Sequence, residues 1–151
     1  MRTHLRWLSA AAAAALLTAC STIPQNTTAT RQASVYDQYA GAPIEGFTYL
    51  GRYDSWTSVG NNQLVVWTTP NDAYLITVRP PCIQLPWVQH IGLTQTAHSV
   101  TQKFDFVLAG HDRCWIQSIQ PVNYLQMKRD MRQKTAQAKA AAEAARQEEQ
   151  N

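Results

Sequence analysis

Residues 44–125 show the short apolar runs and period-two alternation that are typical of β-strands. The runs 63–68 and 73–78 are rich in β-branched and aromatic residues, and the turn residues 69–72 separate them. These two runs are therefore predicted to pair as an antiparallel hairpin, with a preceding strand at 55–59. Further strands are predicted at 47–53, 100–108 and 114–119.

The run 100–108 has the clearest alternation. Its apolar positions recur every second residue, whereas Asp105 falls between them. Because side chains alternate across a strand, the apolar set is predicted to share one face and Asp105 to point to the other. The apolar set consists of Phe104, Phe106 and Leu108.

A short helix is predicted between the two strand pairs. Residues 86–91 begin with a proline and stop before Gly92, a pattern typical of a helix start and a helix end. The predicted fold is therefore mainly β (α+β). It is a small antiparallel barrel or curved sheet of about five to six strands with one short helix, and a C-terminal helical tail follows it.

The segment 126–151 is predicted to be this tail. It holds seven alanines and ten charged residues without Gly or Pro, so its helix propensity is high, and Asn123 is a candidate residue for its start. Its apolar stripe is thin, which indicates a solvated helix; a coiled-coil or partner-docking helix is the alternative. The stripe consists of Tyr124, Met127, Met131, Ala138, Ala142 and Ala145.

The N-terminal 19 residues differ from the rest and read as an export signal. A basic start precedes an apolar stretch from Trp7 to Ala19, and these 13 residues are shorter than the roughly 20 that cross a bilayer as a helix. The stretch ends in Leu17-Thr18-Ala19 followed by Cys20, the pattern of a bacterial lipobox. The alternative is an ordinary secretory cleavage site with a chance cysteine.

A lipid on Cys20 would anchor the mature chain to a membrane without a transmembrane helix. Ser21 rather than Asp follows the cysteine, which predicts an outer-membrane protein facing the periplasm of a Gram-negative bacterium. Residues 20–43 are predicted to be a flexible tether because 21–34 contain few bulky apolar residues. Val35, Tyr36 and Tyr39 could form a helical turn that docks on the domain.

Net charge argues against a nucleic-acid partner. The whole chain carries 13 basic and 10 acidic residues, but removal of residues 1–19 leaves 11 against 10. The predicted domain, 44–125, has four basic and five acidic residues, whereas the tail has six and four. The domain therefore lacks the basic groove that nucleic-acid binding needs.

Two cysteines remain once Cys20 carries lipid. Cys82 and Cys114 are expected to pair, because an exported domain meets an oxidising periplasm. A redox-active pair is the alternative, but such pairs favour a CxxC spacing that this chain lacks.

Six short runs of the domain carry a family resemblance. They are 60–68 (GNNQLVVWT), 71–75 (NDAYL), 81–82 (PC), 91–94 (IGLT), 104–105 (FD) and 113–116 (RCWI). From Phe47 to Val122 the chain resembles a family of small Gram-negative envelope lipoproteins that is catalogued only as a domain of unknown function. The resemblance implies an envelope lipoprotein with a Cys82–Cys114 bridge, and it implies no catalytic residue, ligand or partner.

The sequence contains no GxSxG, HExxH, SxxK or phosphate-binding glycine motif, and no cofactor is expected. His90, His98 and His111 match no metal-ligand spacing, so no metal site is predicted. Tryptophans are the candidate ligand surface, with burial in the core as the alternative. They are Trp56, Trp67, Trp87 and Trp115.

We therefore expect a non-catalytic binding or scaffolding module of the cell envelope. The membrane is its first expected partner, through lipid on Cys20. An envelope protein or peptidoglycan is the second, bound through the C-terminal helix. The alternatives are a periplasmic enzyme, or a binder of glycans or other small ligands, acting on envelope components.

Overall fold

The computed structural model describes residues 35–149. The predicted signal segment 1–19, Cys20 and most of the predicted tether lie outside the described residues. The described chain forms eight strands, a short helix at 35–39 and the long C-terminal helix α2, Tyr124–Glu149. The strands are β1 (Gly46–Thr48), β2 (Ser55–Ser58), β3 (Gln63–Trp67), β4 (Ala73–Val78), β5 (Ile91–Leu93), β6 (Ser99–Thr101), β7 (Phe106–Ala109) and β8 (Asp112–Val122).

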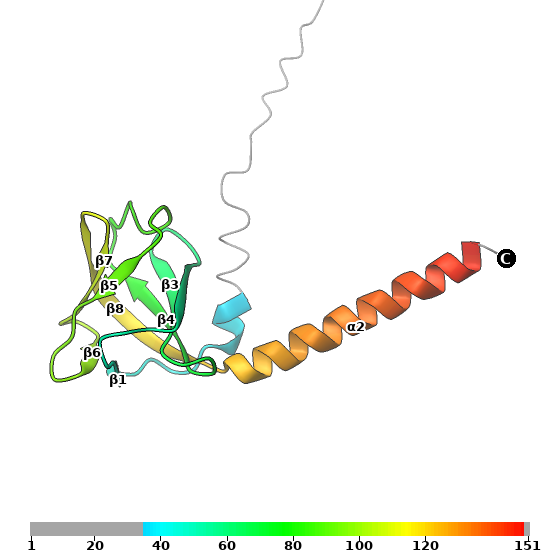
Figure 1. The fold of residues 1–151 in the computed structure, drawn as a ribbon, viewed down its shortest axis with the longest axis horizontal. Helices are drawn as coiled ribbons and strands as arrows, with labels where there is room; N and C mark the ends of the chain where they lie inside the picture. The colour runs from blue at the N-terminus through cyan, green and yellow to red at the C-terminus, as the bar shows by residue number, and fades with distance from the viewer. Residues whose placement is uncertain (1–34, 150–151) are drawn as a thin grey trace, which may run out of the picture.

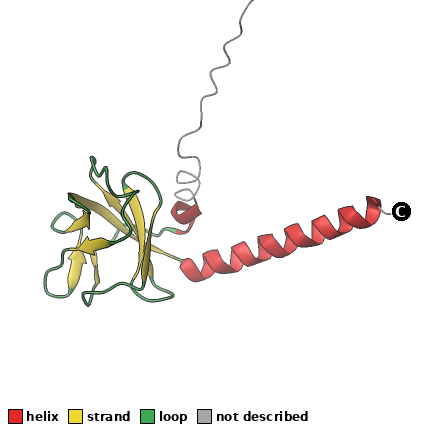
Figure 2. Ribbon diagram, turned by 45° about the horizontal axis from the view of Figure 1, so that its top comes forward, coloured by secondary structure: helices red, strands yellow, loops and turns green. Residues whose placement is uncertain are grey.

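Six of the strands form one curled antiparallel sheet in the order β2-β3-β4-β8-β7-β5, and β1 pairs with β6 in a second, smaller sheet. Together they make a half-barrel from which α2 projects (Figures 1 and 2). The prediction of a mainly β fold with one short helix and a helical tail is thereby confirmed, although the short helix lies at 35–39 and not at the predicted 86–91. The hairpin predicted from 63–68 and 73–78 is β3 paired with β4.

Both faces of the central strands are buried. On β3, Leu64 and Val66 face the interior of the half-barrel, where they pack with side chains such as Ile116. The alternate residues Val65 and Trp67 belong to a second apolar cluster on the opposite face. The helix at 35–39 and the first residue of α2 pack against this second cluster through Tyr36, Tyr39, Ala40 and Tyr124.

The single strand predicted at 100–108 is wrong. The segment is divided between β6 and β7, and its sides are reversed: Asp105 is 3% exposed, whereas Phe104 is 80% exposed. The reason is a set of hydrogen bonds. The Asp105 carboxylate accepts bonds from the hydroxyls of Thr94 and Thr101 and from the Thr101 backbone N–H, each at 2.8 Å, so the carboxylate stays inside the turn.

The helix predicted at 86–91 is also wrong. This segment is a turn in which the backbone N–H groups of Trp87 and Val88 donate to the Gln84 carbonyl, at 2.9 and 3.2 Å. The chain then extends, because Ile91 pairs with Ala109 at the edge of the large sheet. The strand predicted at 47–53 is likewise shorter than expected, since β1 ends at Thr48.

Candidate interaction surfaces

The turn between β4 and β5 presents large apolar side chains to solvent. We call residues 82–90 the Trp87 loop. Trp87 is 83% exposed and Ile83 is 71% exposed, although Cys82 and Leu85 of the same loop are buried in the core. Single exposed apolar residues are common on protein surfaces, but this turn exposes two large ones within five residues. The Trp87 loop is therefore a candidate interaction surface.

Several long-range bonds hold the Trp87 loop in place. A disulfide joins Cys82 to Cys114 with 5.6 Å between their Cα atoms. The Gln84 backbone N–H donates to the Asp112 carboxylate at 2.8 Å, and the Gln84 side-chain oxygen accepts the His111 N–H at 3.2 Å. These bonds tie the loop to the β7–β8 hairpin at Cys82 and Gln84, the residues on either side of the exposed Ile83.

The tip of the β7–β8 hairpin is shaped to receive Gln84. Gly110 has a φ of +60°, a conformation that costs other residues energy. A Cβ at this position would also collide with the Gln84 side-chain oxygen. Glycine is therefore favoured here by the turn conformation, and its lack of a side chain leaves room for the Gln84 side chain.

The four tryptophans proposed as one ligand surface differ in burial and do not form one exposed surface. Trp67 is buried between Tyr36 and Tyr124, with ring centroids at 6.0 and 5.3 Å. Trp56 is half-buried, and its ring N–H donates to the Gln89 carbonyl of the Trp87 loop at 3.4 Å. The remaining two differ in exposure, because Trp115 is half-buried and Trp87 is exposed.

Trp115 belongs to an outer-face cluster that the sequence reasoning missed. It lies directly opposite Phe106 in the β7–β8 register. The Arg79 guanidinium lies 4.4 Å from the Trp115 ring centroid, and the Arg113 guanidinium lies 4.0 Å from that of Phe106. The alternation of apolar residues did single out Phe106, but it predicted that this side chain faces the core and not the outer face.

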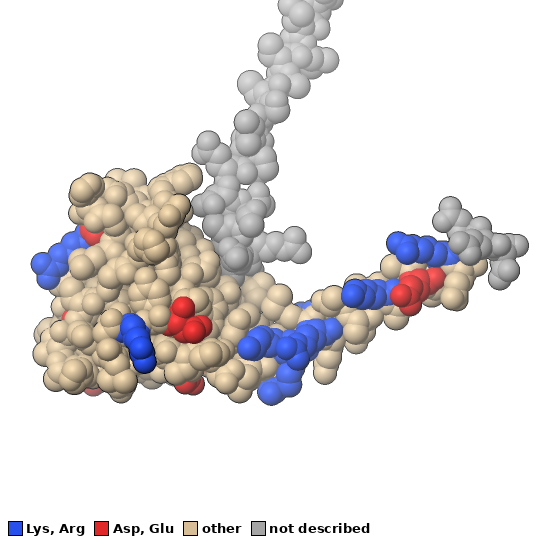
Figure 3. All heavy atoms as spheres, in the orientation of Figure 1, with Lys and Arg blue, Asp and Glu red and all other residues tan. Residues whose placement is uncertain are grey.

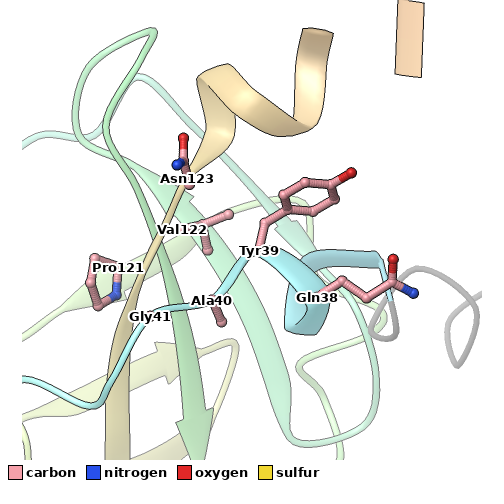
Figure 4. A pocket seen from close by; sticks show the side chains of 7 residues that line it. All are labelled: Gln38, Tyr39, Ala40, Gly41, Pro121, Val122 and Asn123. Carbon is pink, nitrogen blue, oxygen red and sulfur yellow. The ribbon is translucent and has the colours of Figure 1, made fainter. Parts of the chain in front are cut away.

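The N-terminal part of the described chain meets α2 at one corner of the barrel. The Gly41 N–H donates to the Pro121 carbonyl and the Asn123 N–H donates to the Tyr39 carbonyl, both at 2.8 Å. Here lies a pocket of about 510 Å³ (Figure 4). Its lining consists of Gln38, Tyr39, Ala40, Gly41, Pro121, Val122 and Asn123.

This corner also sets the direction of α2. The Asn123 side-chain oxygen accepts the Gln126 N–H at 3.2 Å, which caps the first turn as predicted. The Tyr39 hydroxyl donates to the Asp130 carboxylate at 2.8 Å, and this bond raises the pKa of Tyr39. From Met131 to Glu148 every residue is exposed, so α2 extends into solvent beyond these contacts (Figure 1).

Within the part of the chain that the structure describes, no helix is both long and apolar enough to cross a membrane. In the same part, the group of side chains with the spacing of metal ligands is Cys82, Asp112 and Cys114. Its two sulfurs are bonded to each other in the disulfide, and Asp112 accepts the Gln84 N–H. His90, His98 and His111 are exposed, and none of them belongs to this group.

These features define a small protein with a disulfide-linked antiparallel half-barrel, an exposed apolar loop and a projecting helix. Over residues 1–149 the chain matches the model of a family described as a family of unknown function (DUF6491), and it belongs to that family. The resemblance to a family catalogued only as a domain of unknown function is thus confirmed. No curated protein and no solved structure matches the chain.

Proposed function

We propose that the protein is a non-catalytic binding module of the cell envelope, anchored to the outer membrane by lipid on Cys20 and facing the periplasm. Two sequence features support the location: the cysteine that ends a 13-residue apolar stretch, and Ser21 after it. The Cys82–Cys114 disulfide fits the same location, because disulfides persist in an oxidising compartment.

The binding role rests mainly on the exposure of Trp87 in a loop that is tied down. A large aromatic side chain is the residue type most often found at the energetic centre of a protein interface. A loop that is already held in one arrangement loses little conformational freedom on binding. Trp87 and Ile83 together therefore form an apolar contact site for an envelope protein.

Photo-crosslinking in cells tests this role directly. A photoreactive residue replaces Ile83, and a matched chain carries the same residue in place of Phe104. Phe104 is a suitable control because it is also largely exposed but lies in the β6–β7 turn. The proposal predicts a discrete adduct from position 83 that position 104 does not give. Identical adduct patterns from both positions would refute a specific contact at the Trp87 loop.

Anchoring is tested separately with Cys20→Ser. The lipid cannot be attached without the thiol, so the variant should leave the membrane fraction and appear in the soluble periplasmic fraction. A variant that still fractionates with outer membranes would refute lipid attachment at this residue.

A glycan-binding function is the second candidate, because the exposed ring of Trp87 offers a flat apolar face of the kind on which ligands stack. Fluorescence titration with envelope glycans distinguishes it from protein binding. Quenching that disappears in Trp87→Phe would support the glycan site. Equal quenching in the variant would assign the signal to the other tryptophans.

A further inference from the structure

Basic residues are unevenly distributed along α2. Between residues 128 and 139 the helix carries five basic residues and one acidic residue, whereas 140–149 carry one basic and three acidic residues. Figure 3 shows a cluster of basic side chains on α2 beside the barrel, and farther along the helix two more basic groups with an acidic group between them. The single carboxylate of that half, Asp130, already accepts hydrogen bonds from Tyr39 and Gln126. The one carboxylate between residues 128 and 139 is therefore already engaged in hydrogen bonds.

Four of the six basic side chains of α2 fall on one side of the helix. At 3.6 residues per turn, they lie within an arc of about 40° and run for roughly 27 Å along the axis. The spacing from Arg132 to Lys139 and from Lys139 to Arg146 is seven residues, or about 10 Å each. We call this set the basic stripe: Lys128, Arg132, Lys139 and Arg146.

The basic stripe is available for binding. Arg132, Lys139 and Arg146 are exposed, and none of them forms an ion pair within residues 35–148. Lys128 is half-buried, with its ammonium group 4.7 Å from the Tyr124 ring centroid. Glu143 lies beside this arc, between Lys139 and Arg146, so this side of the helix carries four cations and one carboxylate. Its net positive charge on a projecting helix is complementary to a linear polymer that carries acidic groups at intervals.

We propose that the basic stripe binds the carboxylate-bearing peptides of peptidoglycan, an inference that rests on the proposed envelope location. The surroundings of the stripe favour a polymer over a lipid surface. A helix that lies in a membrane interface needs Trp, Phe or Leu beside its cations. From residue 131 onward α2 has Met131 as its one large apolar side chain, and the remaining uncharged residues are Ala, Gln and Thr.

Sedimentation with purified peptidoglycan sacculi tests this proposal on the full-length, detergent-solubilised protein. The variant Arg132→Gln/Lys139→Gln removes two cations of the stripe. The matched control, Arg129→Gln/Lys134→Gln, removes two cations that point elsewhere and changes the net charge equally. Exposed ion pairs are individually weak, so the stripe variant should lose affinity about fivefold and the control less than twofold. Equal losses of affinity in both variants would overturn the proposal that the basic stripe is the binding site.

Two further arms identify the chemical group that is bound. Sacculi whose carboxylates have been converted to amides should retain little protein. Undiminished sedimentation with the amidated sacculi would overturn the carboxylate assignment. In vesicles that carry the anchored protein, sacculi should protect α2 from trypsin, whereas added phosphatidylglycerol should not. Protection by phosphatidylglycerol alone would assign the stripe to lipid headgroups and overturn the proposal.

The outcome is separable from that of the proposed function. If the protein does not bind sacculi but the position-83 adduct still forms, only the proposal for the basic stripe is refuted. Loss of both would refute the stripe and the binding module together.

Discussion

The disulfide that holds the Trp87 loop should contribute a large share of the stability of the half-barrel. Cys82 and Cys114 are separated by 32 residues and are both buried. Closing a loop of this length removes denatured-state entropy worth about 3.7 kcal/mol at 25 °C in the chain-entropy model. Domains of this size unfold with about 5–15 kcal/mol, so the bridge supplies a large share of the total.

The perturbation is reduction of this one bond. In a Cys20→Ser background, Cys82 and Cys114 are the only cysteines, so dithiothreitol acts on this pair alone. The reduced protein should unfold at a lower urea concentration, and its melting temperature should fall by roughly 15 °C or more. The variant Cys82→Ala/Cys114→Ala is the control, because its unfolding should resemble that of the reduced protein and should not respond to dithiothreitol.

Urea titration followed by tryptophan fluorescence measures both states. A change on reduction equivalent to less than about 1 kcal/mol would refute the reasoning, because loop closure alone exceeds that value. Free thiols detected in the oxidised protein by a thiol reagent would refute it earlier, since the bond would then be absent.

Three further predictions concern the packing. Gly110→Ala should lower the free energy of unfolding by about 1–2 kcal/mol, because alanine is strained at this φ; urea titration measures it. Asp105→Ala should cost about 2–4 kcal/mol in the same assay, because the donors of Thr94 and Thr101 lose a charged acceptor. Burial raises several tyrosine pKa values above the ordinary value of about 10, so ionisation of these tyrosines should leave stability unchanged below pH 10 and lower it above that pH. These tyrosines are Tyr36, Tyr49 and Tyr74.

Each prediction in this group has an outcome that contradicts it. Unchanged unfolding of Gly110→Ala would mean that the backbone at this position does not strain an alanine. Unchanged unfolding of Asp105→Ala would mean that its hydrogen bonds contribute nothing net. Stability that rises between pH 10 and 11 would contradict the burial of the tyrosine hydroxyls.

The β3–β4 hairpin was predictable because its information is local. β-branched residues and turn residues in adjacent positions determine both the strands and their pairing. The start of α2 was predictable for the same reason, since Asn123 caps a helix that begins one residue later. Period-two alternation and capping are both read from a few neighbouring residues.

The errors arose where distant residues decide the structure. Asp105 enters the interior because Thr94, 11 residues earlier, donates to it, and this bond reverses the faces of the following strand. Trp87 remains in solvent because Gln84 is bonded to residues of the β7–β8 hairpin, some 27 residues away. Neither arrangement can be read from the local alternation of apolar residues. For this reason the predictions of a helix at 86–91 and of one surface formed by four tryptophans do not match the structure.

The most direct test of the binding module is the yield of the position-83 adduct in cells that carry a second substitution. Trp87→Ala should weaken a contact centred on this ring by at least about 2 kcal/mol, or roughly 30-fold, and the adduct should disappear. Phe104→Ala removes an equally exposed aromatic ring at another site and should leave the adduct unchanged. An adduct that survives Trp87→Ala, or that is lost equally in Phe104→Ala, would contradict the account.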